Sequence, residues 1–287
     1  MLKLLSKLES KAEDPLFKMH FKSLRTMIED TTHRIPWETN DSIWVSDALK
    51  FFENEGSLWS TYSNGSKPLI MSFISPTDGK NSYYQLYLPR PFDPTKKDYP
   101  FYMELHGSGG GKNDNPRKML LQAYQSEKPG ITLQGFRGEG LYIKPWGRGD
   151  KGYQDQAETD IYECLNHFDN LFQTDETRQY LYGFSMGSMG AFRIAQKDMD
   201  RWAAIGFYSG PGRDITQEQA NLYKDRPVWI AWGEEERRAE EIKAMRDYLV
   251  KAEAEVKWYE VKDVGDKYLQ EYQEKLMDWL KEKKNNR

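Results

Sequence analysis

Short apolar runs alternate with amphipathic stretches beyond residue 98, and this alternation limits the possible folds more than any other feature. It is typical of a mostly parallel sheet that helices cover on both faces. We therefore predict an α/β fold in which the apolar runs are strands and the stretches between them are helices. The predicted strands are 101–105, 141–143, 180–184, 203–208, 228–232 and 256–261, and the predicted helices are 118–127, 158–172, 188–197, 235–252 and 267–281.

The first 66 residues have a different pattern. Apolar residues recur there at three- and four-residue spacing, which predicts helices, and a polar, tryptophan-containing stretch follows and ends in an Asn-Gly-Ser turn signal. Two β-rich runs come next and flank Asp78-Gly79, which predicts a hairpin. We therefore predict an N-terminal accessory region, 1–66, and an α/β domain, 67–287.

The composition excludes several kinds of partner. Lys and Arg number 41 against 45 Asp and Glu, so no basic footprint for nucleic acid is expected. No stretch approaches the roughly 18 apolar residues that span a bilayer, so no membrane partner is expected. Cys164 is the sole cysteine, and without a Cys/His cluster neither a disulfide, a metal nor another cofactor is expected. These counts do not determine the oligomeric state.

The N-terminus begins like the charged segment of a secretory signal. Ser6, Lys7 and Glu9 interrupt its apolar part at once, which indicates an amphipathic helix instead. As written, the chain is expected to be cytoplasmic. If a leader had been trimmed from it, the expectation would be a secreted or periplasmic protein.

Gly183-Phe184-Ser185-Met186-Gly187 matches G-x-S-x-G and is the strongest local signal in the chain. It directly follows a predicted strand and opens a predicted helix, which is the context of a nucleophile elbow. Gly183 and Gly187 leave room for a tight turn that would hold Ser185 exposed at the carboxyl edge of the sheet. Ser185 is therefore the predicted nucleophile, and an ordinary glycine-rich turn is the alternative.

His106-Gly107-Ser108-Gly109-Gly110-Gly111 also follows a predicted strand. It resembles the HGGG-type loop whose backbone N–H groups, together with the N–H after the nucleophile, stabilise a tetrahedral oxyanion. Ser108 and Met186 are the predicted donors of this oxyanion hole, and His106 is predicted to orient the loop. A phosphate-binding loop is the alternative, but Lys112 is not followed by Ser or Thr as that motif requires.

With both loops in this order, the chain resembles the α/β-hydrolase superfamily, and more closely its prolyl-oligopeptidase-like or acetylxylan- and feruloyl-esterase-like branch. The resemblance covers about residues 67–287. It implies the α/β-hydrolase fold, hydrolysis of a carboxylic ester or peptide, and a triad in the order Ser, acid, His. It rests on LHGSGG at 105–110, GRGDKGYQDQAETDI at 147–161, YLYGFSMGSMGAFRIA at 180–195 and VWIAWGEEE at 228–236.

The resemblance implies an acid just beyond the family's seventh strand. Trp232-Gly233-Glu234-Glu235-Glu236 resembles the family's HGxxD pattern and puts Glu236 at the acid position. Glu235 and Asp214 are competitors for this role. The alternative is that the three glutamates only favour the N-terminus of the next helix through its dipole.

The resemblance implies a histidine base in the loop after the eighth strand, where the family reads approximately GxGH. This chain reads Val264-Gly265-Asp266-Lys267, so Asp266 stands at the base position. No histidine follows His167, which lies in a predicted helix before the nucleophile, and His20 and His33 lie in the accessory region. A carboxylate is a much weaker base than imidazole at neutral pH, so we expect reduced or absent activity.

The loop after the predicted strand 141–143 is expected at the same sheet edge as Ser185. Trp146 and Tyr153 are predicted to stack on a sugar or an aromatic acyl group, and Arg148 to bind a carboxylate. The alternative is that this loop packs on itself, and the Arg148-Gly149-Asp150 tripeptide is interpreted as chance rather than as a cell-adhesion motif. A small-molecule or carbohydrate ester is the predicted substrate.

Three hypotheses for the function follow from these residues. The leading one is a serine hydrolase of esterase or peptidase type with an incomplete triad. The second is a non-catalytic binding protein, or pseudoenzyme, that keeps the pocket for a sugar, an ester or a peptide. The third is that Asp266 was introduced by engineering into an active esterase.

Overall fold

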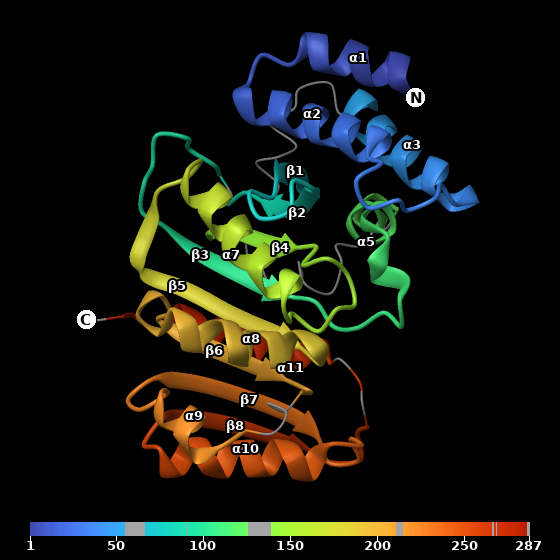
Figure 1. Cartoon of the computed structure of the whole chain (residues 1–287). Helices are drawn as coiled ribbons and strands as arrows, with labels where there is room; N and C mark the ends of the chain where they lie inside the picture. The colour runs from blue at the N-terminus through green and yellow to red at the C-terminus, as the bar shows by residue number, and fades with distance from the viewer. Residues whose placement is uncertain are drawn as a thin grey trace.

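The computed structural model describes residues 1–54, 67–89, 91–125, 139–210, 215–265, 267 and 269–285 (Figure 1). At its centre lies one eight-stranded sheet. Its first three strands in space are antiparallel neighbours, and every later pair is parallel. The spatial order is β1 (Leu69–Ile74), β2 (Asn81–Tyr87), β4 (Leu141–Pro145), β3 (Tyr99–Leu105), β5 (Thr174–Phe184), β6 (Ala204–Tyr208), β7 (Pro227–Gly233) and β8 (Glu255–Val261).

Alternate strand residues build an apolar layer on each face of the sheet. Val228 and Ile230 of β7 belong to the main core cluster, which includes residues of α7, α8 and α10. Trp229 and Ala231 point to the opposite face, where they join the tyrosines of the central strands and the apolar side of α11. The described helices are α1 (Leu2–Lys11), α2 (Pro15–Glu29), α3 (Thr39–Asn54), α5 (Pro116–Leu121), α7 (Gln156–Asp169), α8 (Met186–Lys197), α9 (Gln217–Asn221), α10 (Ala239–Lys251) and α11 (Gln270–Lys281), with 3-10 turns at Lys112–Asp114, Gln122–Tyr124 and Met199–Arg201.

The predicted α/β class, a mostly parallel sheet with helices on both faces, is confirmed. The strands lie where the apolar runs predict them, but some helix ends differ. α10 begins at Ala239 instead of residue 235, because the preceding residues turn back toward the sheet and the Glu236 N–H donates to Gly233 O at 3.1 Å. Across the described residues, no helix is both long and apolar enough to cross a membrane.

The three N-terminal helices lie together at the β1 end of the sheet (Figure 1). Apolar residues from all three belong to the main core cluster, together with residues of β1. A buried ion pair, with 2.7 Å between Arg117 Nε and Asp41 Oδ2, joins α3 to α5. The predicted boundary of the accessory region, at residue 66, lies outside the described residues.

Candidate active site

Ser185 lies at a strained turn between β5 and α8. Its backbone has φ 52° and ψ −114°, a conformation that L-residues rarely adopt, and its N–H donates to Tyr208 O at 2.8 Å. Glycine is required on both sides of the turn. A Cβ at Gly183 would lie 2.2 Å from the Gly187 carbonyl, and one at Gly187 would lie 1.9 Å from Leu105 O. Close packing therefore fixes the backbone of this turn, which we call the elbow.

The glycine-rich loop after β3 is fixed by polar side chains. The two ring nitrogens of buried His106 lie 3.0 Å from Trp146 O and 2.9 Å from Gly107 O, and burial lowers the pKa of this imidazole. The Asp150 carboxylate accepts hydrogen bonds from the backbone N–H groups of Gly109, at 3.0 Å, and Gly111, at 2.6 Å. His106 and Asp150 thus hold the loop that carries Ser108 beside the elbow.

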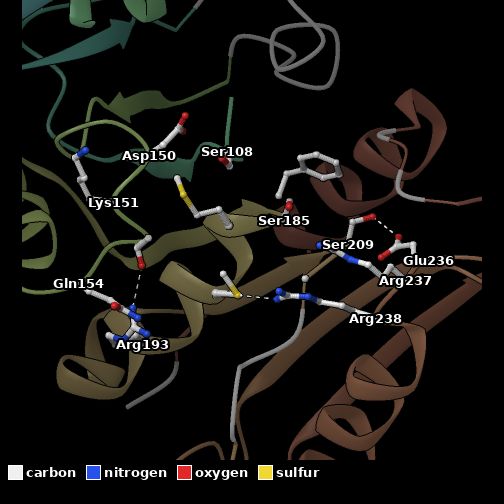
Figure 2. Close-up of a pocket in the computed structure, with 15 residues that line it drawn as sticks. Ser108, Asp150, Lys151, Gln154, Ser185, Arg193, Ser209, Glu236, Arg237 and Arg238 are labelled. Carbon is white, nitrogen blue, oxygen red and sulfur yellow. Dashed lines mark hydrogen bonds between the residues drawn. The ribbon is translucent and has the colours of Figure 1, made fainter. Parts of the chain in front are cut away.

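One cavity of about 590 Å³ brings the elbow, the glycine-rich loop and the loop after β7 together (Figure 2). It contains four of the residues predicted from the sequence: Ser185, Ser108, Met186 and Glu236. Met186 is the first residue of α8, so the N-terminus of that helix faces the cavity. We call this cavity the Ser185 cleft. The other residues that line it are Asp150, Lys151, Gly152, Gln154, Phe184, Met189, Arg193, Ser209, Gly210, Arg237 and Arg238.

Glu236 is buried at the edge of the Ser185 cleft. Its Oε1 accepts hydrogen bonds from the Ser209 hydroxyl and from the Gly233 N–H, the latter at 2.8 Å. The competing Glu235 is exposed, and its N–H donates to Val264 O. Asp214, the other competitor, lies outside the described residues.

The sequence reasoning did not identify Ser209. This residue has φ 50° and directly follows β6, so it stands at the same sheet edge as Ser185. Its position immediately after a predicted strand was the available signal. The hydroxyl donates to the very carboxylate that the resemblance places in the acid role.

None of the four histidines of the chain lines the Ser185 cleft. His20 is buried between α2 and β1, where burial lowers its pKa to about 3. His33 lies 3.2 Å from Arg148, and His167 of α7 contacts the Tyr84 hydroxyl at 3.0 Å. Asp266, at the base position of the resemblance, lies outside the described residues.

Trp146, Arg148 and Tyr153, the predicted substrate-binding residues, do not line the Ser185 cleft. All three are buried in internal contacts. The Trp146 indole N–H donates to Asn113 O at 2.8 Å, and the Tyr153 hydroxyl donates to His106 O at 3.1 Å. These side chains are thus used in packing, as in the alternative prediction, but they pack mainly against other segments of the chain and less against their own loop.

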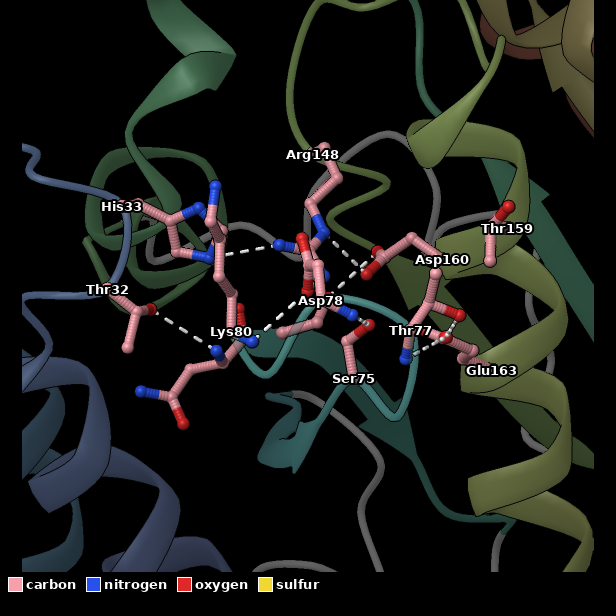
Figure 3. Close-up of polar contacts among 12 residues, drawn as sticks. Thr32, His33, Ser75, Thr77, Asp78, Lys80, Arg148, Thr159, Asp160 and Glu163 are labelled. Atoms are coloured by element: carbon pink, nitrogen blue, oxygen red, sulfur yellow. Dashed lines mark hydrogen bonds and ion pairs between the residues drawn. The ribbon is translucent and has the colours of Figure 1, made fainter.

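Arg148 is the centre of a buried polar network (Figure 3). Its Nε lies 2.7 Å from Asp160 Oδ1, and a terminal nitrogen lies 3.3 Å from Asp78 Oδ1. Burial raises the pKa of Asp160 to about 6, against the opposing effects of Arg148 and of the Ser82 hydroxyl. We call Arg148, Asp160, Asp78 and Ser82 the Arg148 network. Arg148 and Trp146 also line a neighbouring cavity of about 570 Å³, whose wall shares Lys151 and Gln154 with the Ser185 cleft.

The described part of the chain contains no group of three or more His, Cys, Asp or Glu side chains arranged to hold a metal ion. The groups that line the Ser185 cleft include a serine beside the glycine-rich loop, two carboxylates and several cations.

No protein-family model matches the chain, and no curated protein matches it in sequence. Solved structures of esterases and hydrolases are similar to it. A thermostable esterase has a TM-score of 0.63 at 18% identity, over 77% of this chain and 64% of the esterase. A ferulic acid esterase from Anaeromyces mucronatus has a TM-score of 0.55 at 16% identity, over 76% and 90%. A fluorophosphonate-binding serine hydrolase from Staphylococcus aureus, FphF, has a TM-score of 0.56 at 15% identity, over 74% and 96%.

At these identities the likeness concerns the fold. The eight-stranded sheet, its order and its flanking helices are those of the α/β-hydrolase type to which these esterases and hydrolases belong. The chain therefore has the α/β-hydrolase fold.

Proposed function

We propose that this chain is an esterase-type serine hydrolase in which Ser185 is the nucleophile and turnover is slow because no imidazole serves as the base. The proposal rests on the composition of the Ser185 cleft. The strained Ser185 elbow shares a single cleft with Ser108, Met186 and buried Glu236, while all four histidines lie elsewhere. The residues proposed to position an ester thus lie together, and no histidine lies with them to accept the serine proton.

In the proposed reaction, Ser185 Oγ forms a bond to the carbonyl carbon of an ester. The backbone N–H groups of Ser108 and Met186 stabilise the oxyanion, the leaving alcohol departs with a proton, and water then hydrolyses the acyl-serine. A positioned general base contributes about 10²–10⁴-fold to such reactions. Without one, the serine proton passes to water or to a carboxylate, which is a weak base at neutral pH.

Asp266 is proposed to occupy the position of the missing base. An aspartate side chain is shorter than histidine and holds a proton far less readily at pH 7. The Asp266→His variant should therefore hydrolyse esters about 100-fold faster than the parent chain. The same variant tests whether the aspartate replaced a histidine in an active esterase, either naturally or by engineering.

The first experiment is labelling of the full chain with a fluorophosphonate probe, in which Ser185 Oγ bonds to phosphorus and fluoride leaves. Slow labelling that disappears in Ser185→Ala supports the proposal. The substrates to assay beside it are 4-nitrophenyl acetate and methyl ferulate, since ferulic acid esterases are among the similar structures. Absence of any Ser185-dependent labelling contradicts the proposed enzyme. Fast labelling and fast hydrolysis contradict the proposed absence of a base.

A non-catalytic binding protein is the second candidate, and the absence of an imidazole from the cleft favours it. In that case the chain should show no labelling, and an ester or a sugar should raise its melting temperature without being consumed. Turnover of either assay ester by the parent chain excludes this candidate.

A further inference from the structure

Cationic side chains outnumber carboxylates among the described residues of the Ser185 cleft, although the whole chain has more acidic than basic residues. The formal net charge of the chain is −4. Among the residues that the structure describes, four cationic residues line the cleft, namely Lys151, Arg193, Arg237 and Arg238, against two carboxylates, Asp150 and Glu236. The cleft thus has the opposite charge balance from the molecule that contains it.

Both carboxylates of the cleft are used by the protein itself. Asp150 accepts the N–H groups of Gly109 and Gly111 and the side-chain amide of Asn113, the last at 2.9 Å. Glu236 accepts the Ser209 hydroxyl and the Gly233 N–H. Neither of them forms an ion pair with a cation of the cleft among the described residues. Both carboxylates thus hold backbone N–H groups at the wall of the cleft.

Arg237 and Arg238 come from the turn between Glu236 and α10, and their side chains extend toward the cleft (Figure 2). Arg237 is exposed and makes no hydrogen bond or ion pair with any residue that the structure describes. Arg238 contacts Met189 Sδ at 3.6 Å and lies 3.9 Å from the Glu241 carboxylate, a distance at the outer limit of an ion pair. These two guanidinium groups line the cleft and form few contacts with the residues that the structure describes.

The other two cations of the cleft are partly engaged. Arg193 donates from one terminal nitrogen to Gly152 O and Tyr153 O, which fixes its guanidinium at the opposite wall. Lys151 forms an exposed ion pair of 3.0 Å with Asp114. Both still add positive potential to the cavity, as does the N-terminus of α8 at Met186.

We propose that the Ser185 cleft binds an anionic ester, one that carries a carboxylate besides the ester bond, and that Arg237 and Arg238 recognise this carboxylate. That the ligand is an ester rests on the proposed function, and its carboxylate is what we add. A guanidinium group presents paired N–H donors that match the two oxygens of a carboxylate. Arg148, to which the sequence reasoning gave this role, already pairs with Asp160 and Asp78.

The test is equilibrium binding of two stable amides to the full parent chain. N-(4-nitrophenyl)succinamic acid carries a terminal carboxylate, and N-(4-nitrophenyl)butanamide has a methyl group in its place. We expect isothermal titration calorimetry at low salt to show at least tenfold tighter binding of the acid. The preference should shrink when salt is raised from about 0.05 to about 0.5 M, because the Debye length then falls to a few ångströms.

The variant Arg237→Gln/Arg238→Gln should lose this tenfold preference and keep its affinity for the neutral amide. The matched control, Lys243→Gln/Lys251→Gln, removes two positive charges from α10 outside the cleft and should keep the preference. Equal binding of both amides, absence of binding by both, or equal losses in the two variants overturns the proposal. Because nothing is hydrolysed in this experiment, its outcome is independent of whether Ser185 reacts with a fluorophosphonate.

Discussion

The Ser185 cleft and the Arg148 network lie side by side at the carboxyl edge of the sheet and share Lys151 and Gln154 in their walls. The arginines in these two places have different partners. Around Arg148, a buried guanidinium meets the carboxylates of Asp160 and Asp78, so its charge holds the fold together. In the Ser185 cleft, arginines face an open cavity. An arginine at this sheet edge that pairs with buried carboxylates stabilises the fold, whereas one without such partners is available to a ligand.

The largest expected effect is a loss of stability when Arg148 is replaced. Arg148→Met leaves the Asp160 carboxylate, with only 1% of its side chain exposed, without its strongest partner. Removing one member of a buried pair costs about 3–5 kcal/mol. We therefore expect the free energy of unfolding, measured in urea, to fall by about that amount.

Lys151→Met is the matched control for that change. Lys151 belongs to the same loop, but its ion pair with Asp114 is exposed on both sides. Exposed pairs contribute about 0–1 kcal/mol, so this variant should unfold close to the parent. An equal loss in both variants would mean that burial does not distinguish the two cations.

The next largest effect is expected from Gly187→Ala, which changes the backbone packing beside Ser185. An alanine Cβ at Gly187 would lie 1.9 Å from Leu105 O, a backbone atom that cannot move independently of β3. Overpacking of this kind costs about 3 kcal/mol, and fluorophosphonate labelling should disappear with the elbow. Gly265→Ala is the control, because its Cβ would lie 3.7 Å from the nearest atom, Glu235 O. Normal stability of Gly187→Ala would contradict the described elbow.

A pH effect of intermediate size is expected from Asp160. Its pKa is about 6 in the folded protein and 3.8 as its ordinary value, so between these values the folded state binds the proton more tightly. Stability therefore falls as the pH rises from about 4 to about 6, by at most about 1.4 kcal/mol per pH unit. Urea unfolding of the parent and of Asp160→Asn across this range checks the sign. A difference that grows in favour of the parent as the pH rises would refute it.

The smallest expected effect is on the stability of the variant that lacks both cleft arginines of the turn before α10. Arg237→Gln/Arg238→Gln removes two cations that hold no buried carboxylate, so its free energy of unfolding should stay within about 0.5 kcal/mol of the parent. Thermal and urea unfolding measure this directly. A loss as large as that of Arg148→Met would place these arginines among the residues that stabilise the fold.

Much of the fold could be predicted from the sequence, because each strand and helix leaves a local pattern. The apolar runs predict β3 to β8, and Asp78-Gly79 predicts the hairpin, where Gly79 has φ +71°. Helix ends were less predictable. The acidic run before α10 looks helical by composition, but Glu236 turns back to accept the Gly233 N–H, so the helix starts later.

The sequence could predict that Ser185 and Ser108 share a cleft, because backbone turns place them there, but it could not predict which side chains pair across loops. The positions of Ser185 and Ser108 could be predicted because each lies in a glycine-containing motif directly after a predicted strand. Arg148 could be placed at the correct sheet edge, but its partner Asp78 comes from a hairpin 70 residues earlier, and Asp160 comes from α7, the helix that follows. No local pattern shows that these carboxylates turn the arginine inward.

The loop from Trp146 to Tyr153 has a consequence for how the protein folds. At Arg148 it bonds to Asp78, 70 residues earlier, and at Asp150 it fixes the glycine-rich loop about 40 residues earlier. Contacts of such long sequence separation form late, because the intervening chain must first be ordered. The turn at Ser185 depends on distant segments too, because the Ser185 N–H donates to Tyr208 O and Gly187 packs against Leu105 O. Reactivity of Ser185 should therefore appear in the last step of folding and report on the native state alone.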